Sequence, residues 1–336
     1  MGCGAVRRFF YRFVLLLALL LALLAGGAAW WLQQPMALKA VSVDLSIEPG
    51  TPVRAIAREV AAAGVQVNPT LLYWWFRLSG QARQIKAGSY EIESDTSPYR
   101  LLQKLVRGEE SLRAVTLVEG WTFRQFRAAL AKEAFLTHDT EGLDAELIMQ
   151  KLGKPWIAAE GRFFPDTYTY AKGSSELAVL RRAMRAMDKQ LEAAWRQRPP
   201  GSLLQSPEQA LTLASIVEKE TGRASDRDQV AAVFYNRLRL GMRLQTDPTV
   251  IYGLGERFDG NLRRSDLLSD TPWNTYTRAG LPPTPIAMPG KAALHAALHP
   301  AKSSALYFVA RGNGSSQFSD SLEEHNRAVN KYQRGQ

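Results

Sequence analysis

The chain has 336 residues and a formal net charge of +10 at neutral pH, a length that provides for more than one domain and a sizeable core. Its basic residues are scattered, with no long basic run, zinc-finger spacing or RNA-binding signature, so we predict no nucleic-acid partner. The excess positive charge suits an acidic counterpart such as a phospholipid surface or peptidoglycan. The single cysteine, Cys3, excludes an intrachain disulfide and a cysteine-based metal site.

The four histidines lack the spacing of a zinc motif. His295 and His299 are four residues apart and could share a helix face, but Pro300 follows directly and no acidic third ligand is near in the sequence. We therefore predict that the protein uses neither a metal nor a cofactor.

An uncharged segment rich in Leu and Ala lies at residues 13–32 and is long enough to cross a bilayer as one helix. Arg7, Arg8 and Arg12 precede it, so the positive-inside rule places residues 1–12 in the cytoplasm. The sequence therefore predicts a single-pass anchor with the rest of the chain on the far side of the membrane. A cleaved signal peptide is the alternative, which the length of the apolar run disfavours.

Residues 41–112 predict a small α+β subdomain. Apolar and polar side chains alternate at 41–47, and a second strand is expected at 85–92. Two helices, at 51–63 and 69–78, are expected between these strands. The order strand, helix, helix, strand resembles a LysM-like glycan-binding module, and a generic spacer domain is the alternative.

Residues 113–333 predict a larger α+β domain whose most informative part is a helix that Ser206 and Pro207 open and Gly222 can end. Helical periodicity places Glu218 of this helix near apolar side chains, where the pKa of a carboxyl group should rise. Such a group can donate a proton near neutral pH. The same wheel places Glu220 between apolar residues, so periodicity does not choose between the two acids, and an ordinary salt bridge is the alternative for Glu218.

Two polar loops follow this helix. The first contains Gln245, Thr246 and Asp247 before a proline, and the second begins at Asn274 and is stiffened by further prolines. Long ordered loops in a compact domain tend to be functional, so both loops are candidates for a binding site.

The longest strings in this part of the chain resemble the endolytic murein transglycosylases, the YceG-like family. These strings are Ala214–Thr221, Val233–Leu238 and Met242–Tyr252. Shorter strings match the same family in the same order, at Glu119–Gly120, Phe164–Tyr168, Asn274–Tyr276, Gly280–Pro283, His299–Ala301 and Tyr307–Val309.

The resemblance implies a catalytic domain at 113–333 that cuts peptidoglycan glycan strands internally, on the periplasmic side of the cell inner membrane. It implies cleavage of the β-1,4 bond between N-acetylmuramic acid and N-acetylglucosamine without water, which leaves a 1,6-anhydro end. It assigns the catalytic acid to the first Glu of the Val-Glu-Lys-Glu string, which is Glu218. Peptidoglycan synthases are candidate partners.

Five residues are expected to line the cleft and hold the glycan by hydrogen bonds and stacking. They are Gln245, Thr246, Asp247, Tyr252 and Asn274. Purely structural roles are the alternative for each of them. At the level of the whole protein, a non-catalytic peptidoglycan-binding scaffold is the competing hypothesis. A peptidase is disfavoured because the chain lacks a nucleophile elbow and a zinc motif.

Overall fold

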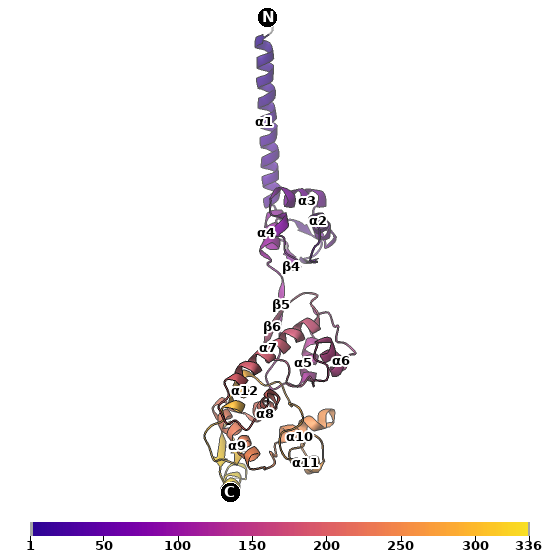
Figure 1. The fold of residues 1–336 in the computed structure, drawn as a ribbon. Helices are drawn as coiled ribbons and strands as arrows, with labels where there is room; N and C mark the ends of the chain where they lie inside the picture. Colours follow the sequence, from indigo (N-terminus) through magenta and orange to yellow (C-terminus); the bar gives the residue numbers. More distant parts are fainter. Residues whose placement is uncertain (1–2, 335–336) are drawn as a thin grey trace. The chain divides into compact units, whose positions relative to one another are not determined.

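The computed structural model describes residues 3–334, and they form a mixed α+β fold, as the sequence predicts (Figure 1). Contacts within the chain divide it into two units. The first unit is Met1–Arg113 with Ala171–Gly173, and the second is Ala114–Tyr170 with Ser174–Gln336.

Helix α1 (Cys3–Gln33) opens the first unit. Its part from Arg12 to Gln33 is long and apolar enough to cross a membrane, and none of it is buried inside the protein. The helix begins ten residues before the predicted span of 13–32, because nothing in the preceding residues breaks helical structure.

The rest of the first unit contains the predicted order of strand, helix, helix and strand. Strand β2 pairs antiparallel with β4, and the buried side chains of β2 alternate with exposed ones. Asn68 accepts hydrogen bonds from the two amides that open α3, and Gly108 ends α4 with a positive φ of 72°. The elements are β1 (Ala37–Leu38), β2 (Ser42–Ile47), α2 (Val53–Ala62), β3 (Val65–Gln66), α3 (Pro69–Leu78), η1 (Ala82–Gln84), β4 (Gly88–Glu93) and α4 (Pro98–Arg107).

The chain continues through strand β5 (Leu112–Thr116), which pairs with β6 (Thr167–Ala171). The remaining elements belong to the second unit and are mostly helical. They are α5 (Phe123–Leu130), α6 (Ala145–Lys151), α7 (Glu176–Arg196), α8 (Pro207–Glu220), η2 (Ala224–Asp226), α9 (Arg227–Arg239), α10 (Asp247–Leu254), η3 (Gly255–Arg257), α11 (Arg264–Leu268), α12 (Lys291–Leu298), β7 (Tyr307–Ala310), β8 (Ser316–Ser319) and α13 (Leu322–Gln333).

Helix α8 is the centre of the second unit. It begins as its sequence predicts, with the Ser206 hydroxyl accepting from the Gln209 amide and Pro207 in the first turn. Residues 210–217 are all buried, because α7, α9, α10 and α12 pack around the helix. The helix is therefore enclosed on all sides before its last turn.

The loop before α10 is shorter than the sequence suggested. Asp247 begins the helix and Pro248 occupies its first turn, so only the residues up to Thr246 form the polar loop. Proline suits this position because an amide hydrogen in the first turn of a helix has no acceptor within the helix, so its absence costs no hydrogen bond.

Candidate active site

The second unit contains a polar cavity of about 360 Å³ at the end of α8. Its walls come from α8, α9, the loop that leads into α10, the segment around Tyr276, strand β7 and helix α13. The described residues that line it are Glu220, Phe234, Arg237, Leu244, Gln245, Thr246, Asp247, Tyr276, Tyr307, Phe308, Leu322 and His325.

Glu220 is one of two acids that line this cavity, with Asp247. Its carboxylate accepts a hydrogen bond from the Thr246 hydroxyl. Burial raises the pKa of Glu220, the nearby charge of Asp247 raises it further, and the Thr246 hydrogen bond opposes both effects. Glu220 is also the last residue of α8, where the helix dipole disfavours a negative charge. Burial, the neighbouring acid and the helix end thus all oppose a negative charge on this carboxyl group.

The loop that faces Glu220 is held by hydrogen bonds to Thr275 and Tyr276. Gln245 has a positive φ of 49°, and its amide donates to the Thr275 carbonyl at 3.1 Å. The Thr246 amide donates to the Thr275 hydroxyl at 3.1 Å, and the Tyr276 hydroxyl donates to the Asp247 carboxylate at 2.5 Å. Gln245, Thr246 and Asp247 thus lie together on one wall, as the sequence predicts.

The far wall combines a cation with stacked rings. The rings of Tyr307 and His325 stack with centroids 5.2 Å apart, and the Arg237 guanidinium lies 5.0 Å from the Tyr307 centroid. Arg237 is buried, and it donates to the carbonyls of Leu306 at 2.7 Å and Leu244 at 2.9 Å. This arginine therefore fixes two walls of the cavity at once.

Glu218 lies outside the set of described residues that line this cavity. Its carboxylate accepts from the Gly290 amide at 3.0 Å. Burial raises the pKa of Glu218, the charge of Glu119 raises it further, and the Gly290 hydrogen bond and nearby cations lower it. A side chain at position 290 would put its Cβ 1.9 Å from Glu119, so the glycine allows the two carboxylates to approach. The lining of this cavity thus brings Glu220 together with the Gln245–Asp247 loop and does not include Glu218.

Tyr252 also lies away from the cavity lining. Its ring packs edge-on against Trp273 with centroids 5.4 Å apart, and its hydroxyl is bonded to Glu160. The carboxylate of Glu160 in turn accepts from the Phe123 amide at 3.0 Å. Tyr252 therefore has a structural role here, because its hydroxyl donates a hydrogen bond to a carboxylate that is buried away from water.

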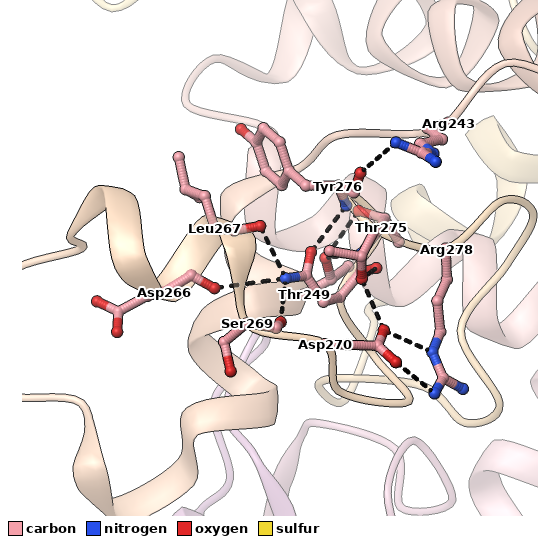
Figure 2. Close-up of polar contacts among 11 residues, drawn as sticks. Arg243, Thr249, Asp266, Leu267, Ser269, Asp270, Thr275, Tyr276 and Arg278 are labelled. Carbon is pink, nitrogen blue, oxygen red and sulfur yellow. Dashed lines mark hydrogen bonds and ion pairs between the residues drawn. The ribbon is translucent and has the colours of Figure 1, made fainter.

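Asn274 is fully buried and holds its own loop together. Its amide nitrogen donates to the carbonyls of Ser269 at 2.6 Å and Leu267 at 3.0 Å, and its oxygen accepts from the Tyr276 amide at 2.8 Å. Figure 2 shows these contacts, with the outer ion pair between Asp270 and Arg278 nearby. The prediction that Asn274 faces the substrate is not supported by this geometry, and the residue positions Tyr276 instead.

We expect Asn274→Ala to lower the free energy of unfolding by about 2 kcal/mol, because buried carbonyls lose their donor. Arg278→Ala removes only an exposed ion pair and should change the stability by less than about 1 kcal/mol. Denaturant unfolding of the two variants checks this. Equal losses of stability would contradict the assigned role of Asn274.

Among the lining residues that were not predicted as site residues, four have a charged or hydrogen-bonding ring side chain: Arg237, Tyr276, Tyr307 and His325. Three of them lie inside the strings that carry the family resemblance, so the strings were a usable signal. His325 lies on the terminal helix α13, and nothing in its local sequence indicated that this helix closes the cavity.

A buried carboxyl group that faces tyrosine rings and a row of hydrogen-bonding side chains is an arrangement suited to acid catalysis on a carbohydrate. The fold and the cavity therefore fit the class of enzymes that act on glycans.

Comparison with known proteins agrees with this class. The model of the YceG-like family matches residues 45–331. The chain is 33% identical over 308 residues to an endolytic murein transglycosylase from Bacillus subtilis (strain 168), covering 87% of this chain and 85% of that protein. An endolytic murein transglycosylase from Streptococcus pneumoniae serotype 2 is 29% identical over 323 residues, covering 85% of this chain and 58% of that protein.

A crystal structure of a yceG-like protein from Listeria monocytogenes is also similar. The TM-score is 0.54 and the identity 30%, with 85% of this chain and 98% of that one covered. The chain belongs to the YceG-like family.

Proposed function

We propose that this protein cleaves the glycan strands of peptidoglycan internally and without water, with Glu220 as the proton donor. As a member of the YceG-like family, whose curated relatives are endolytic murein transglycosylases, it is a lytic transglycosylase. The observation that carries the choice of acid is the position of Glu220 in one cavity with Gln245, Thr246 and Asp247.

The donor could be either glutamate of the Val-Glu-Lys-Glu string. The family resemblance assigned it to Glu218, and that assignment stays a prediction. We choose Glu220 because it shares one cavity with Gln245, Thr246 and Asp247, and the Thr246 hydroxyl donates to its carboxylate. Glu218 lies outside the lining of that cavity. Each glutamate accepts a hydrogen bond and has a second acid nearby, so these two features do not separate them.

The proposed bond is the β-1,4 link between N-acetylmuramic acid and N-acetylglucosamine. Glu220 gives its proton to the glycosidic oxygen as the C1–O bond breaks. The C6 hydroxyl of the same muramic acid captures the oxocarbenium-like carbon, and the Glu220 carboxylate takes the hydroxyl proton. One carboxyl group therefore suffices, whereas hydrolysis ordinarily uses two. Capture within the ring benefits from a high effective molarity.

The proposed location is the inner membrane, with α1 as a single-pass anchor, the N-terminus in the cytoplasm and the catalytic unit in the periplasm. This location suits action on nascent strands, and peptidoglycan synthases are candidate partners there. The order of β2, α2, α3 and β4 supports the proposal of a LysM-like module that binds glycan.

Digestion of purified sacculi in water enriched in ¹⁸O tests the reaction. We expect soluble fragments with 1,6-anhydro-muramyl ends that carry no heavy oxygen. Fragments with ¹⁸O at a reducing end would show a hydrolase, and severed stem peptides would show a peptidase. An intact sacculus to which the folded protein remains bound would support the scaffold hypothesis instead.

A further inference from the structure

The outer face of α3 in the first unit exposes large apolar side chains. Leu71, Trp74 and Leu78 are 54%, 50% and 78% exposed. Their spacing of three and four residues places them on one side of the helix. The opposite side packs into the core of the unit through Leu72 and Phe76. α3 is therefore apolar on two sides, although a surface helix in water ordinarily has one apolar stripe.

Contacts within the unit bring helix α3 close to the end of the membrane-spanning segment. The Met36 amide, three residues after α1, donates to the Thr96 carbonyl at 3.0 Å. The Trp75 indole donates at 3.1 Å to the carbonyl of Pro98, the first residue of α4. Helices α1 and α4 are in contact, and Figure 1 shows α3 beside the C-terminal end of α1. The segment after α1 and helix α3 are therefore both held at the start of α4.

The composition of α3 suits a layer of lipid headgroups. The helix contains no acidic residue, and the exposed Arg77 lies beside the apolar stripe. Tyr73 and Trp74 are rings with a polar atom, the side chains that concentrate at membrane–water interfaces. A cationic residue beside a large apolar face is the pattern of a helix that lies in the plane of the interface.

We propose that the outer face of α3, defined by Leu71, Trp74 and Leu78, lies in the headgroup layer of the bilayer that α1 spans. The proposal rests on the membrane anchoring put forward above. A bilayer that surrounds α1 would continue to this face at the end of the helix. A second copy of the chain or a water-soluble protein has no such continuity with α1. Insertion of this face fixes how the first unit is held at the membrane surface.

The test uses the full chain in liposomes of phosphatidylcholine and phosphatidylglycerol. Cys3→Ser removes the single cysteine. Trp74→Cys or, as the matched control, Glu48→Cys then takes an environment-sensitive NBD label. Glu48 is exposed and follows Ile47, which pairs with Gly88. The pair of Ile47 and Gly88 lies at the start of β4, and the other end of β4, which leads to Thr96, is about 17 Å away at about 3.4 Å per residue. Position 48 therefore serves as a control that is distant from the end of α1.

We expect a lipid that carries a nitroxide near its headgroup to quench the label at position 74 at least about twofold more than the label at position 48. Leu78→Cys keeps Trp74 in place and should be quenched like position 74. Equal quenching at positions 48, 74 and 78 would overturn the proposal. So would crosslinking between copies at position 74 without quenching by the lipid, which would identify a second copy as the occupant.

Alkaline carbonate extraction of the same liposomes reports on the anchor separately. We expect every variant to stay with the lipid. Release of the protein would contradict the anchoring, whereas retained protein with an unquenched label at positions 74 and 78 would contradict only the docking of α3.

Discussion

Glu220→Gln is expected to lower the rate of release of anhydro-muropeptides by about 10³-fold, the usual contribution of a general acid. Glutamine keeps the shape of the side chain and can still accept from the Thr246 hydroxyl. The substitution therefore removes the proton while it leaves the cavity intact. Initial rates on purified glycan strands, measured for protein with unchanged thermal stability, check the expectation.

Glu218→Gln is the matched control, because it makes the same chemical change two residues away. Its amide oxygen can still accept from the Gly290 amide, so we expect activity within a few-fold of the unaltered protein. Loss of activity in Glu218→Gln together with retention in Glu220→Gln would return the catalytic role to Glu218.

The second large effect concerns stability and pH. Glu160 is buried, and this burial raises its pKa from 4.5 to about 7 in spite of the hydrogen bonds that it accepts. In the unfolded chain the carboxyl group loses its proton near pH 4.5, whereas the folded protein holds the proton to about pH 7. The unfolded state therefore binds fewer protons between these two values, and stability falls as the pH rises through this window. The rise in pKa corresponds to about 3 kcal/mol at full ionisation.

Glu160→Gln should remove most of this dependence, because the glutamine has no proton to lose. Glu141→Gln alters an exposed acid and should keep the slope of the unaltered protein. Free energies of unfolding from denaturant titrations between pH 4 and pH 8, values that bracket the window set by the pKa shift, provide the comparison. A slope that survives Glu160→Gln would mean that other groups cause it.

Local signals in the sequence predicted the beginnings of α3 and α8. Ser206 with Pro207 opens α8, and Asn68 opens α3, because a cap depends on residues that are adjacent in the chain. The apolar segment of α1 and the α+β class follow from patterns of the same local kind.

The choice between Glu218 and Glu220 depended on contacts that are distant in the sequence. Helix α8 is enclosed on all sides, so a wheel could not show which way its last turn faces. Thr246 meets Glu220 and Gly290 meets Glu218, 26 and 72 residues further along the chain. Asn274 shows the same limit for loops. A polar side chain in a loop can bind a ligand or its own backbone, and its type does not decide between them.

The most direct measurement of the central claim is the alkaline limb of the pH–rate profile in two variants. The negative charge of Asp247 raises the pKa of Glu220, and that of Glu119 raises the pKa of Glu218. If Glu220 is the acid, Asp247→Asn lowers its pKa, so activity should be lost at a lower pH than in the unaltered protein. Glu119→Gln should leave that limb in place. A limb that moves in Glu119→Gln and stays fixed in Asp247→Asn would contradict proton donation by Glu220.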